Sequence, residues 1–329
     1  MNTPTLLHMT APLREDFTIP YHDFGPAAER PTLALVAGLH GNELNGIFVL
    51  SRLAECVRRI AEGLQRDQTI AGRIIVVPAV NVLGVNAGSR RWPFDKTDIN
   101  RMFPGYNLGE TTQRIADAVF QLTRTAHYRI DVHSSNAEFE EVPQVRLYEP
   151  SADESASAML FGLPAVIERS TDNVFTTTLG HAWHTAGGEN FVIQAGRAGD
   201  LQLPHCERLF RALMAFLHHT GIVTGIQLAP EDQDSHYFPL GQTFPLISDY
   251  AGLFVSPVQV GAWLQAGDLI GHVYDAFLGE RRAEIRAPVG GLLSGIRRQP
   301  LLYEGDLIAR LQTSARVEGG ASAVRGQEQ

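Results

Sequence analysis

Several features that define common protein classes are missing from this chain of 329 residues. Only two cysteines are present, Cys56 and Cys206, and both fall in helical patterns, so we expect buried small side chains and no disulfide framework. No apolar run approaches the roughly 18 residues that span a bilayer. The N-terminus also lacks a cationic segment followed by an apolar core. These absences lead us to expect a cytoplasmic protein.

Positive charge is scarce as well. The chain has 27 Lys and Arg against 36 Asp and Glu, a formal net charge of -9, which argues against nucleic acid and against an anionic membrane as partners. Hydrophobic residues make up 44% and charged residues 19%, as in an ordinary globular protein with a sizeable core. We therefore expect a small-molecule partner, and the sequence leaves a homo-oligomer open.

Buried strands alternate with helices in the first two thirds of the chain. Residues 32–39 and 73–80 are almost continuously apolar, which is typical of strands covered on both faces. Between them, apolar positions recur at helical spacing from residue 46 to Gly63. We expect residues 128–132 to form the next strand. This alternation predicts an α/β fold, with a mostly parallel or mixed sheet and helices on both faces.

The composition of the chain changes near residue 228, where glycine, proline and short β-like runs become dominant. We predict a main domain over residues 1–227, a small all-β module over 228–313 and a flexible tail over 314–329. The module resembles the barrel-sandwich fold of biotinyl and lipoyl domains. It lacks the hairpin lysine that those carriers modify, so we expect it to be structural or to form a rim of the active site.

Two histidines and one glutamate are placed to form a metal site. His40 and Glu43 directly follow the strand at 32–39, and His133 directly follows the strand at 128–132. Sites in open α/β sheets lie beyond the carboxyl ends of the strands. Two histidines and one carboxylate, with a fourth position left open, are a common set of catalytic zinc ligands. Asp131 is placed to orient one of the imidazoles.

The stretch between these ligands, residues 81–109, follows neither helical nor strand periodicity. A loop of that length inside a compact domain is usually functional. It contains the pair Asn100 and Arg101, which is able to hold a carboxylate through two hydrogen bonds. It also contains Arg90 and Arg91, either of which is suited to stabilising an oxyanion. The alternative for these two arginines is an exposed ion pair.

Three motifs together resemble the succinylglutamate desuccinylase/aspartoacylase family, which is related to zinc carboxypeptidases. They are Gly38-Leu-His-Gly-Asn-Glu43, Asp98-Ile-Asn-Arg-Met-Phe-Pro-Gly105 and Asp131-Val-His133. The resemblance covers most of residues 30–222. It implies a zinc carboxypeptidase-like fold and one zinc ion on His40, Glu43 and His133.

The same resemblance implies roles in substrate binding. Arg101, with Asn100, would hold the α-carboxylate of the substrate. An arginine further upstream, Arg90 or Arg91, would polarise the carbonyl of the amide that is cleaved.

The sequence departs from the family pattern on a late strand. The family carries its general base there as the glutamate of a Glu-x-Gly motif, whereas this chain has Gln194 in Phe191-Val-Ile-Gln-Ala-Gly196. An amide cannot accept a proton from water. Three explanations stay open. Glu189 takes over as the base, Gln194 only positions water in a slower metal-assisted reaction, or the protein binds its ligand without turnover.

The sequence thus predicts a zinc-dependent amidohydrolase that deacylates a small N-acyl amino acid or a related N-acyl amine. One alternative is a zinc carboxypeptidase acting on peptides, and the other is a metal-dependent binding protein that has lost catalysis. His181 and His184 lie near the departing strand. We favour a place for one of them in the pocket wall or at a turn over a role as a metal ligand.

Overall fold

The computed structural model describes residues 4–11, 13, 15–26, 30–171, 176–228 and 234–314. Residues 315–329 of the expected tail lie outside these ranges, as do residues 229–233 just beyond the expected domain boundary. Within them, Cys56 and Cys206 are free thiols. None of the described helices combines the length and apolarity that a bilayer crossing requires.

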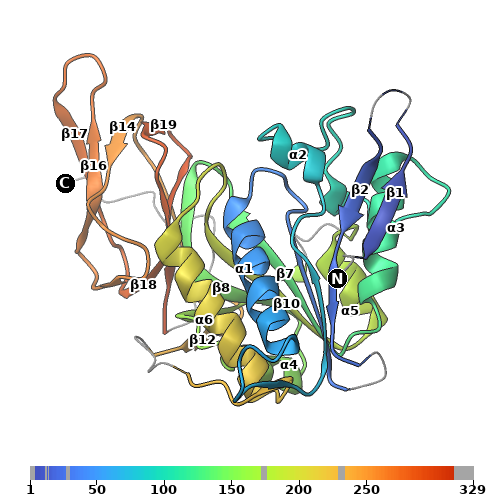
Figure 1. The fold of residues 1–329 in the computed structure, drawn as a ribbon. Helices are drawn as coiled ribbons and strands as arrows, with labels where there is room; N and C mark the ends of the chain where they lie inside the picture. The colour runs from blue at the N-terminus through green and yellow to red at the C-terminus, as the bar shows by residue number, and fades with distance from the viewer. Residues whose placement is uncertain are drawn as a thin grey trace.

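A twelve-stranded mixed sheet runs through the molecule (Figure 1). Four neighbouring strands at its centre, β10-β7-β4-β6, are parallel, and β8 pairs antiparallel with β10. This confirms the predicted α/β fold with a mixed sheet. The central strands are β4 (Thr32–Ala37), β6 (Arg73–Val77), β7 (Tyr128–Ser135), β8 (Phe139–Tyr148) and β10 (Glu189–Arg197).

Helices cover both faces of this sheet because its central strands are apolar on both sides. In β4, Leu33 and Leu35 enter one core with α1 and α6, whereas Val36 enters the opposite core with α3 and α5. Figure 1 shows α1 and α6 side by side across one face. The helices are α1 (Leu44–Ala61), α2 (Val82–Asn86), α3 (Thr111–Thr123), α4 (Ala152–Met159), α5 (Leu179–Ala186) and α6 (Leu203–His219).

Short strands surround the central part of the sheet. β1 and β2 form a separate hairpin, β3 pairs with β6 at one end of the sheet, and β9 pairs with the second half of β8. A single 3₁₀ turn, Ile99–Arg101, holds the Asn-Arg pair. The short strands are β1 (Thr5–Met9), β2 (Phe17–Pro20), β3 (His22–Phe24), β5 (Thr69–Ile70), β9 (Ala165–Arg169), β11 (Val223–Thr224) and β12 (His236–Phe238).

The C-terminal strands continue the central sheet. β18 pairs with the first half of β8, placing Gly295 opposite Glu141. Glycine is required there because a Cβ atom would lie 2.4 Å from the ring of Phe139. These strands also share a core of their own; the boundary at residue 228 stays a prediction. They are β13 (Thr243–Ile247), β14 (Gly252–Val255), β15 (Trp263–Leu264), β16 (Leu269–Tyr274), β17 (Arg281–Arg286), β18 (Gly291–Arg297), β19 (Leu301–Leu302) and β20 (Leu307–Gln312).

Candidate metal centre

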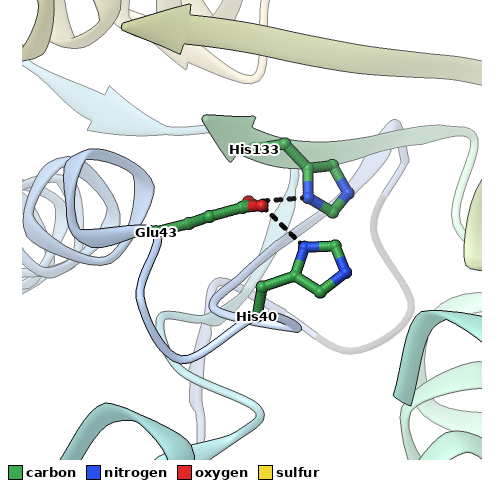
Figure 2. Close-up of side chains that lie close together, drawn as sticks. All are labelled: His40, Glu43 and His133. Carbon is green, nitrogen blue, oxygen red and sulfur yellow. Dashed lines mark hydrogen bonds and ion pairs between the residues drawn. The ribbon is translucent and has the colours of Figure 1, made fainter. Parts of the chain in front are cut away.

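Two neighbouring parallel strands bring the three expected ligands together. β4 and β7 pair with Ala37 opposite Val132, so the chain leaves both strands at the same edge of the sheet. His133 follows at once on β7. His40 and Glu43 lie in the turn that leads from β4 into α1, and Glu43 is the last residue before that helix. Figure 2 shows the three side chains converging from the strand, the turn and the start of the helix.

Each oxygen of the Glu43 carboxylate contacts one imidazole. Oε1 lies 2.7 Å from Nδ1 of His40, and Oε2 lies 2.9 Å from Nδ1 of His133. The backbone N–H of Ser134 donates to Oε2 at 3.0 Å. One donor atom from each of the three ligands lies within 4.8 Å of the others. A single cation can therefore be reached by all three side chains.

The other nitrogen of each imidazole is held by a second carboxylate. Nε2 of His133 lies 2.8 Å from Oδ2 of Asp131, and Nε2 of His40 lies 3.1 Å from Oδ1 of Asp98. Such partners fix the ring orientation and the tautomer of metal-binding histidines. The contact from Asp131 was expected, but Asp98 had no assigned role. Only its place beside Asn100 in the same loop pointed to it.

The electrostatics of this cluster suit a divalent cation. Burial alone would raise the pKa of the Glu43 carboxyl, but the charges of His40 and His133 hold it well below its usual range. Burial would lower the pKa of His133, yet Asp131 and Glu43 raise it well above its ordinary value. The two carboxylates beside His133 thus favour its protonated form when no cation is bound. Binding of a metal replaces such protons, because only neutral imidazoles are ligands.

The donor set fits zinc. Two neutral imidazoles and one carboxylate, with a further position open, are found in catalytic zinc sites. His40, Glu43 and His133 are 3%, 2% and 7% exposed, so the cluster is shielded from solvent. Two more carboxylates stand directly behind the imidazoles. The residues that are present thus fit a buried divalent cation.

A cavity of about 620 Å³ opens on this cluster, which is within the size range of small-molecule sites. Arg90 lines it, donating from Nη1 to Glu43 Oε1 at 3.2 Å and from Nη2 to Asp98 Oδ2 at 3.5 Å. Arg91 is exposed and does not belong to its lining. Of the two candidate arginines, the structure therefore places Arg90 at the metal cluster.

The Asn-Arg pair also lines the cavity, and so do both histidines of α5. Asn100 accepts a hydrogen bond from the N–H of Leu179 at 2.9 Å, which fixes its amide against the start of that helix. Arg101 donates to the carbonyl of Asn100 at 2.8 Å. His181 and His184 line the same cavity, and neither belongs to the three-ligand cluster that the described residues form.

The two residues considered for the missing base lie at different ends of β10. Gln194 pairs with His133 across the sheet, lines the cavity and is 8% exposed. Glu189 pairs with Tyr128 at the start of both strands. Five residues of strand separate them, about 16 Å. The geometry does not support Glu189 as the base. The register places it at the amino ends of these strands, whereas the metal ligands lie at their carboxyl ends.

The cavity wall also holds a carboxylate that the sequence did not suggest. Glu141 on β8 is 1% exposed and lies across from Gly196, two residues beyond Gln194. It accepts hydrogen bonds from Arg146 and Arg310. No sequence signal pointed to it, because its partners lie 5 and 169 residues away.

The fold and the site define an α/β protein with a His-Glu-His cluster, able to hold a metal ion, at the carboxyl ends of its parallel strands. Comparison with known proteins identifies the family. The succinylglutamate desuccinylase/aspartoacylase catalytic domain matches residues 29–220, so this chain belongs to that family. This confirms the resemblance that the three sequence motifs carried.

Relatives match over most of the chain. The N-α-acetyl-L-2,4-diaminobutyric acid deacetylase of Halomonas elongata is 29% identical over 85% of this chain and 82% of its own. The product-bound ectoine utilization protein EutE (DoeB) from Ruegeria pomeroyi is 26% identical, with a TM-score of 0.71 over 91% of this chain and 90% of that one. A succinylglutamate desuccinylase from Silicibacter sp. is 28% identical, with a TM-score of 0.73 over 91% and 89%.

Proposed function

We propose that this protein is a zinc-dependent amidohydrolase that removes the acyl group from a small N-acyl amino acid or related N-acyl amine. The observation that carries the proposal is the His40–Glu43–His133 cluster at the base of a cavity that also contains Arg90, Asn100 and Arg101. The names of two relatives, a deacetylase and a desuccinylase, both describe removal of an acyl group. One zinc ion per chain fits the three ligands.

Each residue around the cluster has a defined task in this proposal. Arg101 and Asn100 hold the α-carboxylate of the substrate and thereby place its amide bond. Arg90, beside Glu43, stabilises the negative charge that develops on the carbonyl oxygen. A bound zinc ion would polarise that carbonyl and lower the pKa of water. Asp131 and Asp98 keep the two imidazoles oriented.

Gln194 determines how fast such an enzyme works. Its amide is able to position a water molecule by a hydrogen bond but not to take its proton. A missing general base typically costs about 100- to 10,000-fold in rate. We therefore expect a slower deacylase than a family member with glutamate at this position.

The test is release of free amine from N-acyl amino acids by the zinc-loaded protein, with the chelated protein as reference. Arg101→Ala should raise the KM for an N-acyl amino acid but leave hydrolysis of an N-acyl amine without a carboxylate unchanged. Arg91→Ala, an exposed arginine of the same loop, is the matched control. Equal amine release before and after chelation would contradict the proposal, as would a clear preference for peptides.

A second candidate is a metal-dependent binding protein without turnover, which Gln194 specifically favours. Gln194→Glu distinguishes a slow enzyme from a binding protein. Glutamate restores a proton acceptor at this position in the cavity wall, which is 8% exposed. In a slow enzyme the substitution raises an existing kcat. In a binding protein it creates activity where the unaltered chain has none.

A further inference from the structure

Two strands flank Gln194, and each places one residue directly beside it. Gln194 pairs with His133 of β7 on one side and with Gln144 of β8 on the other. Directly paired residues point to the same face of a sheet, so the three side chains stand in one row on the cavity face. Neighbouring strands lie about 4.8 Å apart. Gln194 therefore stands between the metal cluster and Gln144, beside both.

The backbone around Gln194 is fixed by its neighbours. The regular pairing of β10 with both flanking strands breaks directly after this residue, and Gly196 has a φ of +66°. Asn45 of α1, which is 0% exposed, donates from Nδ2 to the carbonyl of Ala195 at 3.3 Å. A Cβ atom at Gly196 would lie 2.6 Å from that nitrogen, so glycine is required there. What remains to be set is the direction of the Gln194 side chain.

Gln144 is a buried amide that has no hydrogen bond of its own. It is 0% exposed, and neither its Oε1 nor its Nε2 has a partner among the described residues. An unpaired buried amide is rare, because it loses its bonds to water without replacing them. Gln194 lies directly opposite with a complementary amide. Cross-strand side chains stand about 5 Å apart, so rotation about side-chain torsions brings the two amides into hydrogen-bond contact.

Arg146 covers Gln144 and determines the direction of this hydrogen bond. It lies two residues further along β8, and its Nη2 donates to both oxygens of Glu141, at 2.6 and 2.7 Å. The Arg146 side chain thus runs back along the strand over position 144. Its Nε is buried and has no partner in the described part of the chain. Because an arginine only donates, Oε1 of Gln144 is the atom that suits Nε. Nε2 of Gln144 is then left for Gln194.

We infer that Gln144 is a positioning residue that makes the amide of Gln194 a hydrogen-bond donor toward the metal cluster. Nε2 of Gln144 donates to Oε1 of Gln194, so the NH₂ group of Gln194 points into the cavity. There it donates to the carbonyl oxygen of the substrate as negative charge develops on it. This last task rests on the proposed function, whereas the Gln144–Gln194 pair rests on the sheet register and on the unpaired buried amide.

Gln144→Met removes the amide and keeps the length of the side chain. In the zinc-loaded protein, we expect kcat for an N-acyl amino acid to fall by about 3- to 10-fold, the effect of one hydrogen bond. KM should stay within about twofold, because the carboxylate contacts are untouched. Gln194→Met removes the donor itself and should lower kcat by about 100-fold. Added to Gln194→Met, Gln144→Met should lower kcat no further, since no amide is left to position. An unchanged kcat in Gln144→Met, or a full additional loss in the double variant, would overturn the positioning role.

Gln144→Glu tests the direction of the hydrogen bond. The carboxylate has the shape of the amide, and the neighbouring Arg146 keeps it ionised, so it only accepts hydrogen bonds. It would draw the NH₂ group of Gln194 away from the cavity. We expect the same loss of kcat as in Gln144→Met. A wild-type kcat in this variant would overturn the assigned direction.

Gln312→Met is the matched control. Gln312 is likewise 0% exposed, but its amide donates to Ser294 and accepts from Thr243, and it does not line the cavity. Its substitution should lower folding stability without changing kcat. Equal losses of kcat in Gln144→Met and Gln312→Met would show a general effect of packing and would overturn the positioning role.

Urea unfolding separates failure of this pair from failure of the proposed function. If the two amides bind each other, Gln144→Met should change the unfolding constant by about 3- to 10-fold less in the Gln194→Met background than in the wild type. This coupling is measured whether or not the chain cleaves an amide. Equal effects in the two backgrounds would overturn the pair. Coupling without any amine release would support the pair and contradict the proposed function.

Discussion

Asp131→Asn isolates the contribution of the carboxylate behind His133. Asparagine keeps the shape of the side chain and an oxygen able to accept from Nε2 of His133, so the ring stays in place. The negative charge 2.8 Å from that nitrogen is lost. The imidazole then becomes a poorer donor to a cation. We expect weaker zinc binding with the ligand geometry retained.

The magnitude follows from the burial of this pair. The side chains of His133 and Asp131 are 9% and 2% exposed, so solvent screens their interaction little. Loss of such a partner typically costs 10- to 100-fold in metal affinity, or about 1.4–2.8 kcal/mol. Oδ1 of Asp131 is buried without a partner among the described residues. The asparagine amide placed there would also lower folding stability by about 1–3 kcal/mol.

Competition with a chromophoric chelator measures the zinc affinity directly. Asp98→Asn is the internal comparison. The distance from Asp98 to His40 is longer, at 3.1 Å, and the Asp98 side chain is 15% exposed and also pairs with Arg90. We expect a loss of less than about tenfold there. Undiminished affinity in Asp131→Asn, or a larger loss in Asp98→Asn, would refute the reasoning.

Three further predictions concern the site, the pH response and the core. Arg90→Ala should lower kcat for amide hydrolysis by about 100- to 1,000-fold, with Arg91→Ala near wild type. Despite burial, His205 and Arg298 lower the pKa of Glu140 from 4.5 to about 2. Its ionised form therefore stabilises the fold above about pH 4.5, and the effect is lost as the pH falls toward 2. Glu140→Gln should cost roughly 1–2 kcal/mol at pH 7, allowing for solvent screening, and about half of that or less near pH 3; urea unfolding at both pH values checks this. Leu53→Ala, at a 0% exposed position, should cost about 2–5 kcal/mol in the same assay.

The metal cluster could be predicted from the sequence because each ligand lies close to a recognisable strand. β4 is almost wholly apolar, and Gly38-Leu39 leads from its end to His40, whereas His133 lies within β7, directly after its apolar Val132. Parallel strands that end together then bring the ligands to one place. The motif residues Asn100 and Arg101 reach the same cavity because a 3₁₀ turn, anchored to α5 through Asn100, holds them there.

The position of Glu189 and the charge pairing on β8 could not be predicted from the sequence in the same way. Glu189 is close to Gln194 in sequence, but only the register of β10 shows that strand direction carries the two to opposite edges. β8 contains Glu140, Glu141 and a proline, which is unlike a buried strand. Arginines more than 150 residues away, Arg298 and Arg310, compensate its charges. Such long-range pairing leaves no periodic trace in the sequence.

Metal content of the purified chain, measured by mass spectrometry after dialysis, tests the central claim most directly. If three side chains from two distant segments bind one cation, the wild type should contain close to one zinc per chain. The same arrangement predicts near-complete loss in His133→Ala, with His219→Ala, a histidine in the last turn of α6, unaffected. Full zinc retention in His133→Ala would contradict the account.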